Sequence, residues 1–349
     1  MASLSARPPS LVAGRRCRSS RRWSNTIAPR ASSEQQPSSS SSSPRFPRGR
    51  VLIAPAFYVD AAPFRPLAAE LRRRGYDAAL APIRWYHWVP TLGGRSQRPI
   101  LDRLDWALED LTNGGEDNSP APVDPVTLEL PPRRGEGRQR SYSLLDFLLE
   151  MRDPSQGARP LHPAATPPAS PLPPQQKAAI VASSAAGWIA RILLSGARLA
   201  GGAAPYGGRS YVSAPERCHT LITLGTPHYS EEAVTKRNTD WVNNHATKPD
   251  NVRFVAVGAT GVRGKQWLAG TGDFAFESYK LCSGDGHDDG DGVTPLRCAL
   301  ALEGAEAKLE LAGAEHTPPL FGAKKKGDWY GEGAFLERWV GYLSPPPAE

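Results

Sequence analysis

The sequence predicts an α/β fold, a mostly parallel, doubly wound sheet with helices on both faces. Short apolar segments of strand length alternate along the chain with segments of helical pattern. The central strand-like segments are apolar throughout, as expected for strands that are covered on both faces. One of them, within residues 177–188, passes through a tight turn bearing a serine and continues directly into a helical segment.

Two strand–helix units come first. A strand at 51–55 precedes a helix at 64–74, which Gly75 ends. A second strand at 76–82 precedes an amphipathic helix at 100–111. The apolar face of that helix is formed by Leu101, Leu104, Leu108 and Leu111.

Residues 112–176 interrupt this alternation. The Asn113-Gly-Gly turn and the proline-rich stretch 160–174 do not fit a packed strand or helix, so a largely disordered insertion is expected. Within it, only Ser143–Arg152 has a helical composition. Its apolar side chains would suit a lid over an active site, but the pattern favours a loop with one packed helix.

The second half of the chain supplies the remaining strands. After the serine-bearing segment, strands are expected at 218–224, 253–257 and 309–311, and a helix at 335–343 closes the fold. Residues 344–349 form a proline-rich, disordered tail. Residues 51–343 are therefore expected to form one large α/β domain, long enough to bury a substantial core.

The turn at Ser184 has the features of a nucleophile elbow. An apolar strand at 178–181 precedes it, a helical segment follows, and the residues around the serine are small. Such a turn lifts one hydroxyl above the carboxyl edge of the sheet, where only small neighbours fit. Ala182 and Ala186 occupy the two positions where G-x-S-x-G has glycine. Taken alone, the segment also fits an ordinary serine in a βα loop.

Two downstream sites strengthen the catalytic interpretation. Asp291 stands between Gly290 and Gly292 with Pro295 close behind, a sharp turn that presents one carboxylate. His316 follows the strand at 309–311 and precedes Thr-Pro. Other acids in the loop 283–292 compete with Asp291; that loop fits a solvated acidic loop better than a calcium site, because it lacks the spacing of an EF-hand. The competing acids are Asp285, Asp288 and Asp289.

Three segments carry a resemblance. They are the elbow with its trailing Gly187-Trp188, the block Leu221-Ile-Thr-Leu-Gly-Thr-Pro-His228, and Gly290-Asp-Gly-Val-Thr-Pro295. In these segments the chain resembles the lipase-like α/β-hydrolases of plant and algal plastids, over residues 51–343 outside the insertion. The resemblance implies the α/β-hydrolase fold, in which the catalytic residues follow the chain order serine, acid, histidine. The chain departs from the family's pattern at Ala182, at Ala186 and at Thr294, where valine is more usual.

The resemblance implies a serine hydrolase that cleaves carboxylic, lipid-like esters through an acyl-enzyme. Ser184 would be the nucleophile, His316 the base and Asp291 the acid that orients it. The family's geometry assigns the oxyanion hole to the backbone N–H groups of Ala185 and Phe57. The first-strand loop, 54–58, lacks the usual glycine-rich turn.

Three further features near these segments are candidates for the site: His228, Tyr58 and an aromatic group. His228 fits either the pocket wall or a structural hydrogen-bonding role, and Tyr58 is a pocket candidate. The aromatic group at 85–88 fits the wall of an acyl pocket or the core, and the core is favoured. No cofactor is expected, because no glycine-rich phosphate-binding motif follows any strand. No metal site is expected either, because the histidines lack metal-ligand spacing.

The positive charge of the chain is concentrated at its start. Residues 1–50 contain ten arginines and one acidic residue, a net charge of +9, whereas the whole chain carries +7 and residues 51–349 therefore carry −2. This distribution does not fit a nucleic-acid-binding surface. A leader rich in Ser and Arg and poor in acids is typical of an organellar transit peptide, here for a chloroplast; a plain disordered tail is the alternative.

The remaining composition limits the other expectations. Cys218, Cys282 and Cys298 are expected to be thiols, and whether Cys282 and Cys298 can form a redox-linked bridge around Asp291 stays open. No apolar run is long enough for a transmembrane helix, which leaves peripheral membrane contact open. The sequence does not indicate an oligomeric state. The alternative to an enzyme is a non-catalytic binding or scaffold protein on the same fold; a nucleotide-dependent enzyme is poorly supported.

Overall fold

The computed structural model describes residues 48–94, 97–113, 170–196, 211–268, 270–319 and 327–346, all within the unit that spans residues 43–349. The expected transit peptide lies almost entirely outside these residues. So do the helix expected at Ser143–Arg152, most of the insertion and the end of the tail. No helix among the described residues is long and apolar enough to cross a membrane.

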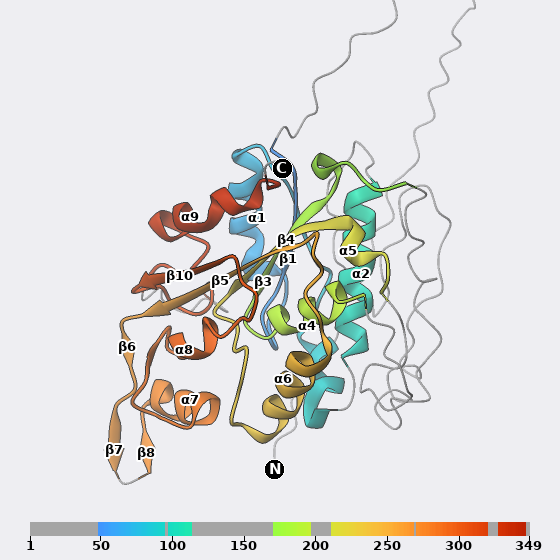
Figure 1. The fold of residues 1–349 in the computed structure, drawn as a ribbon. Coiled ribbons are helices and arrows are strands. Elements are labelled where there is room, and N and C mark those ends of the chain that lie inside the picture. The colour runs from blue at the N-terminus through green and yellow to red at the C-terminus, as the bar shows by residue number, and fades with distance from the viewer. Residues whose placement is uncertain are drawn as a thin grey trace, which may run out of the picture. The chain divides into compact units, whose positions relative to one another are not determined.

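A six-stranded sheet forms the centre of the fold, with the strand order β10-β5-β4-β3-β1-β2 (Figure 1). Every neighbouring pair in it is parallel. The strands are β1 (Arg50–Ala54), β2 (Asp77–Leu80), β3 (Ala178–Ser183), β4 (Cys218–Leu224), β5 (Arg253–Thr260) and β10 (Ala307–Ala312). Parallel pairing places the carboxyl ends of all six strands at the same edge, which is where side chains from distant parts of the chain can meet.

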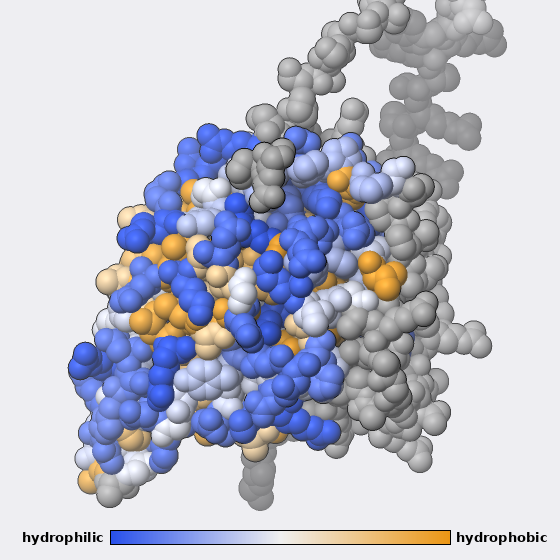
Figure 2. Space-filling model, in the orientation of Figure 1, coloured by the Kyte–Doolittle hydropathy of each residue, from blue (hydrophilic) through white to orange (hydrophobic). Residues whose placement is uncertain are grey.

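Helices cover both faces of this sheet (Figure 1). One face carries α2 (Arg98–Asn113), α4 (Ala186–Leu194), α5 (Ala214–Arg217) and α6 (Ala233–His245). The other carries α1 (Arg65–Arg73), α9 (Gly333–Trp339) and the 3₁₀ turn η5 (Val340–Leu343). Alternate residues of β1 belong to opposite cores: Leu52 packs on the first face and Ile53 on the second. This alternation explains why a central strand such as β3 is almost entirely apolar, whereas the edge strand β10 alternates between apolar and charged residues. The face of the molecule seen in Figure 2 is mostly hydrophilic, with small hydrophobic groups between the polar residues.

A subdomain of small elements lies between β5 and β10, beyond the carboxyl end of β5 (Figure 1). Two short antiparallel pairs, β6 with β9 and β7 with β8, flank the helix α7. Their bounds are Val262–Arg263 (β6), Gln266–Leu268 (β7), Thr271–Gly272 (β8), Phe274–Ser283 (α7) and Asp289–Gly290 (β9), and α8 (Leu296–Ala299) follows them. The sequence analysis did not predict these elements.

The remaining elements are short 3₁₀ segments: η1 (Ala62–Phe64), η2 (Trp85–Gly94) and η4 (Pro174–Gln176). One of them, η4, and the helix α2 change the boundaries expected for the insertion. The predicted insertion loses residues at both ends, since Thr112 and Asn113 belong to α2 and 174–176 form η4. The preference for the core at residues 85–88 is correct for Trp88, which is fully buried, and wrong for Trp85, which is 48% exposed.

Arg50 joins the two ends of the insertion. Its Nη1 donates to the carbonyl of Thr112, at the end of α2, at 3.0 Å, and to that of Gln176, just before β3, at 2.8 Å. Thr112 and Gln176 are therefore held beside the amino end of β1, at the edge of the sheet opposite the carboxyl ends of the strands.

The predicted fold class is confirmed. The sheet is parallel and doubly wound, helices cover both faces, and the serine-bearing turn joins the end of β3 directly to α4, as the strand-to-helix turn of the α/β-hydrolase fold does. The helix expected at 335–343 is divided between α9 and η5.

Candidate active site

Ser184 lies in a sharp turn between β3 and α4. Its φ is +53°, a left-handed conformation that non-glycine residues rarely adopt and that costs about 1–3 kcal/mol. The peptide N–H of Ser184 donates to Leu224 O of β4 at 2.8 Å, and its carbonyl accepts from Thr226 Oγ1 at 2.7 Å and from Gly187 N–H at 3.0 Å. These bonds hold the strained turn in place from both sides.

The small residues around the turn are explained by packing. Ala182 and Ala186 are fully buried, and the positive φ falls on Ser184 itself, so neither alanine needs the conformational freedom of glycine. Gly187 does lack room: a Cβ there would lie within 3 Å of the Thr226 side chain. The departure from G-x-S-x-G is therefore compatible with an elbow.

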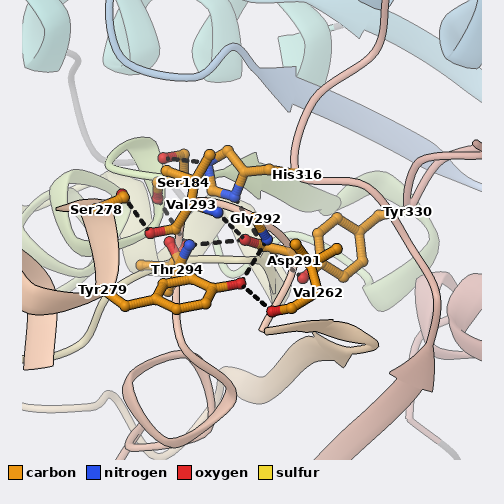
Figure 3. Close-up of polar contacts among 11 residues, drawn as sticks. Ser184, Val262, Ser278, Tyr279, Asp291, Gly292, Val293, Thr294, His316 and Tyr330 are labelled. Atoms are coloured by element: carbon orange, nitrogen blue, oxygen red, sulfur yellow. Dashed lines mark hydrogen bonds and ion pairs between the residues drawn. The ribbon is translucent and has the colours of Figure 1, made fainter. Parts of the chain in front are cut away.

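His316 joins two groups that are far apart in the sequence (Figure 3). Its Nε2 lies 2.9 Å from Ser184 Oγ and its Nδ1 lies 2.7 Å from Asp291 Oδ2. A carboxylate can only accept, so Nδ1 carries the proton and Nε2 is free to accept from the serine hydroxyl. All three side chains are at most 9% exposed. The three residues that the sequence analysis selected are thus connected by hydrogen bonds.

The loop after β9 fixes the Asp291 carboxylate. Oδ1 accepts the backbone N–H groups of Val293 and Thr294 at 3.0 and 2.7 Å. Tyr279 of α7 clamps the same loop, since its hydroxyl accepts from Gly292 N–H at 2.7 Å and donates to the carbonyl of Val262 at 2.8 Å (Figure 3). The small subdomain therefore holds the acid in position.

The three competing acids are engaged elsewhere. Asp285 accepts from the His287 backbone N–H, and Asp289 accepts from the Gly261 backbone N–H and pairs with Arg263 at 3.4 Å. Asp288 pairs with Arg297 at 2.8 Å and accepts from Ser283 Oγ. Within the described residues, no group of three or more His, Cys, Asp or Glu side chains is arranged to hold a metal ion.

The proposed oxyanion donors lie on neighbouring loops. Ala185 immediately follows the nucleophile, and Phe57 lies in the turn after β1, which the Val59 N–H to Ala56 O bond closes. In the sheet, β1 is the direct neighbour of β3, with Ala54 opposite Ala182, so the two loops leave the same edge side by side. The use of these N–H groups by an oxyanion stays a prediction.

A row of aromatic rings continues from Phe57, one of the two oxyanion candidates. The Phe57 ring contacts those of Tyr58 and Trp88, with centroids 4.6 and 5.2 Å apart, and Tyr58 lies 6.3 Å from Trp85. Phe57, which lies in the loop after β1, is 41% exposed. The row therefore presents apolar surface to solvent at this loop.

His228 is buried beneath the site and is not part of the triad. Its Nε2 lies 3.2 Å from Thr223 Oγ1, its backbone N–H donates to Cys298 O, and its carbonyl accepts from Asn243. Burial, together with the charge of Arg191, holds the pKa of His228 well below its ordinary value, so the ring is neutral. Of the two roles that the sequence left open, these contacts favour the structural one.

Cys282 and Cys298 are neighbouring free thiols. Both are buried, and both contribute backbone carbonyls to the same loop, which accept from Glu231 and His228. The hydrogen bond between the two thiols, together with burial, raises the pKa of Cys282. Cys282 and Cys298 are therefore neighbours in the fold, and no disulfide joins them in this structure. Whether they can form a redox-linked bridge stays open.

Three further residues complete the site and were not predicted from the sequence. Tyr330 donates to Asp291 Oδ2 at 2.8 Å, Tyr279 clamps the acid loop, and Gly225 lies under the Asp–His pair. Gly225 stands in the Leu-Gly-Thr-Pro-His block, which was the one available signal. Neither tyrosine belongs to a recognisable motif.

Gly225→Ala is expected to lower kcat by about 100-fold or more, because small displacements of catalytic groups are costly. Gly225 has a φ of +57°, and a Cβ there would lie 2.6 Å from Asp291 Oδ2 and 3.0 Å from His316 Nδ1. Gly196→Ala is the matched control, since Gly196 has the same φ but its nearest neighbour, Pro215 Cγ, lies at 3.4 Å. Ester hydrolysis and thermal melting of both variants would test this. Equal activity losses would mean that backbone strain, not the clash, is responsible.

Comparison with family models gives no match, and neither does comparison with curated proteins. Among solved structures, the chain is similar to the mature form of the Bacillus licheniformis lipase BlEst2. The similarity covers 85% of this chain and 92% of that one, with 13% sequence identity and a TM-score of 0.44.

Proposed function

We propose that this protein is a serine hydrolase that cleaves carboxylic esters through an acyl-enzyme. The observation that carries the proposal is the hydrogen-bond chain from Ser184 Oγ through His316 to Asp291, with the serine held at positive φ on a strand-to-helix turn. A nucleophile, a base within hydrogen-bond reach and a group that orients the base are the parts that acyl transfer requires.

In the first half of the reaction, Ser184 Oγ attacks the ester carbonyl while His316 Nε2 takes its proton. Asp291 keeps the proton on Nδ1 and stabilises the imidazolium that forms. The negative oxygen of the tetrahedral intermediate accepts the N–H groups of Ala185 and Phe57. As the intermediate collapses, the C–O bond to the leaving group breaks, and the alkoxide departs with the proton from Nε2.

In the second half, water replaces the alcohol. His316 removes a proton from water, the hydroxide attacks the acyl carbon, and the second tetrahedral intermediate expels Ser184 Oγ, which regains its proton. The products are the carboxylic acid and the regenerated enzyme.

A lipid-like acyl group is the substrate class that we propose. The aromatic row of Phe57, Tyr58 and Trp85 adjoins the loop after β1 and offers exposed apolar surface where the acyl part of an ester would emerge. Binding there would remove apolar area from water on both partners.

The alternative is a binding or scaffold protein on the same fold with catalysis lost. The alanines of the elbow and the first-strand loop without a glycine-rich turn are the features that favour it. A fluorophosphonate probe separates the two functions, since it phosphonylates only an activated serine hydroxyl and releases fluoride.

The wild-type protein is expected to gain the mass of one phosphonyl group, and Ser184→Ala none. Ser183→Ala is the matched control: it removes the adjacent buried hydroxyl, which has no hydrogen-bond partner among the residues that the structure describes, and should label like the wild type. The measurement is intact-protein mass after a timed reaction, with thermal melting as the check of folding. A folded wild type that does not label would favour the binding protein.

A further inference from the structure

Tyr330 stands beside His316 because two chain segments run together. Glu315 and Trp329 form a parallel bridge, and the backbone N–H of Glu315 donates to Asp328 O at 3.0 Å. His316, which follows Glu315, therefore lies beside Tyr330, which follows Trp329. The Tyr330 carbonyl accepts from Trp339 Nε1 at 2.8 Å, which fixes the backbone, and the residue is fully buried.

The Tyr330 hydroxyl reaches the acid of the triad. It lies 2.8 Å from Asp291 Oδ2, the same oxygen that accepts from His316 Nδ1 at 2.7 Å (Figure 3). Oδ1 takes the N–H groups of Val293 and Thr294. The carboxylate thus accepts four hydrogen bonds, two on each oxygen, and three of the four donors are independent of the histidine.

Tyr330 can act only as a donor to this carboxylate. Burial and the nearby Asp291 charge raise the pKa of Tyr330 well above its ordinary value, so the phenol keeps its proton. Two other titratable groups near the pair, Tyr279 and Cys282, stay neutral as well. Burial raises the pKa of Tyr279, and the hydrogen bond to Cys298 and burial raise that of Cys282. Asp289, on β9, is engaged with Arg263.

We propose that Tyr330 is a positioning residue of the hydrolase: its hydroxyl fixes Asp291 Oδ2 and sets how readily the Asp291–His316 pair takes up a proton. The inference rests on the proposed function, since the pair is useful only if His316 serves as a base. Tyr330 does not contact substrate, because it is fully buried behind the carboxylate.

The sign of the effect follows from the charge of the pair. A donor stabilises the pair most when it is unprotonated, because the carboxylate is then not balanced by an imidazolium. Removing the donor therefore favours protonation, wherever in the pair the proton resides. Protonated His316 cannot accept the serine proton. As the pH is lowered, the variant without the donor would therefore lose activity at a higher pH than the wild type does.

Tyr330→Phe tests this directly, because it removes the hydroxyl and keeps the ring. The acid limb of the kcat/KM profile is expected to move up by about half to one pH unit. At the optimum, kcat should fall several-fold and KM should stay within about twofold. Tyr279→Phe is the control: its hydroxyl bonds only two backbone groups, the N–H of Gly292 and the carbonyl of Val262, and not the carboxylate of Asp291. Its loss is expected to lower stability and kcat but to leave the acid limb in place.

A second variant is expected to shift the acid limb in the opposite direction. Replacing Tyr330 with 3,5-difluorotyrosine by site-specific incorporation preserves the ring and makes the hydroxyl a stronger donor. The acid limb should then move to lower pH. This variant keeps every contact of the native residue, so it also tests the inference if Tyr330→Phe does not fold.

A third measurement does not depend on turnover. The imidazole of His316 can be titrated by NMR in the wild type and in both variants, with its signals assigned from their loss in His316→Gln. The titration midpoint should rise in Tyr330→Phe and fall with difluorotyrosine. Coincident midpoints would overturn the inference even if the enzyme is active. Shifted midpoints without ester hydrolysis would instead support the role of Tyr330 and remove the proposed function.

Discussion

Ser184→Ala is expected to lower kcat for ester hydrolysis by about 10⁵- to 10⁶-fold, and a change of His316 to glutamine by about the same factor. The serine hydroxyl is the only nucleophile that the hydrogen-bond chain activates, and His316 Nε2, 2.9 Å away, is the base that activates it. The residual rate would come from the oxyanion donors and from substrate binding.

The double variant distinguishes a catalytic unit from two separate contributions. If Ser184 and His316 act together, removing both should cost little more than removing either one. The measurement is hydrolysis of a chromogenic ester by the four proteins, with circular dichroism as the check of folding. If the loss of kcat in the double variant equals the product of the two single losses, the two residues do not act as one catalytic unit. Wild-type turnover by Ser184→Ala would contradict the whole mechanism.

Asp291→Asn should cost about 10³- to 10⁴-fold in kcat, less than the loss of the serine. An asparagine amide can donate to Nδ1, which would move the proton of His316 to Nε2 and remove the acceptor for the serine hydroxyl. The side chain would still occupy its place under the N–H groups of Val293 and Thr294 through its carbonyl oxygen. The protein should therefore fold and bind ester but react slowly.

Asp289→Asn and Asp285→Asn are the matched controls for Asp291. They lie in the same loop, but their carboxylates bond backbone N–H groups and, for Asp289, Arg263, instead of the histidine. Both variants should keep kcat within about twofold, since exposed ion pairs contribute little. If Asp289→Asn loses activity while Asp291→Asn keeps it, the assignment of the acid is wrong.

The sheet, and the three side chains that are hydrogen-bonded to one another at its edge, could be predicted because the sequence signals for them are local. A strand covered on both faces is apolar throughout, as residues 178–181 are, and a sharp turn needs small residues around Ser184. Asp291 could be selected from four candidate acids because the Gly-Asp-Gly-Val-x-Pro pattern around it matches the family that the sequence resembles.

The missing parts depend on contacts between distant segments. Tyr330 is important because the bridge at Glu315 and Trp329 sets it beside His316, and no sequence spacing encodes that bridge. α7 escaped prediction for a different reason: Phe274 and Leu281 are 75% and 57% exposed, so its apolar residues are not confined to the face that is buried.

The guanidinium of Arg50, which holds the carbonyls of Thr112 and Gln176 together, has a consequence for how the chain can vary. The two ends of the segment between those positions are thus held close together by the folded core. For a flexible loop, each doubling of length then costs only about 0.6 kcal/mol of closure entropy. The point of exit is also remote from Ser184, at the opposite edge of the sheet. This junction is therefore a place where sequence can be gained, shortened or exchanged for a whole module while the catalytic edge keeps its geometry.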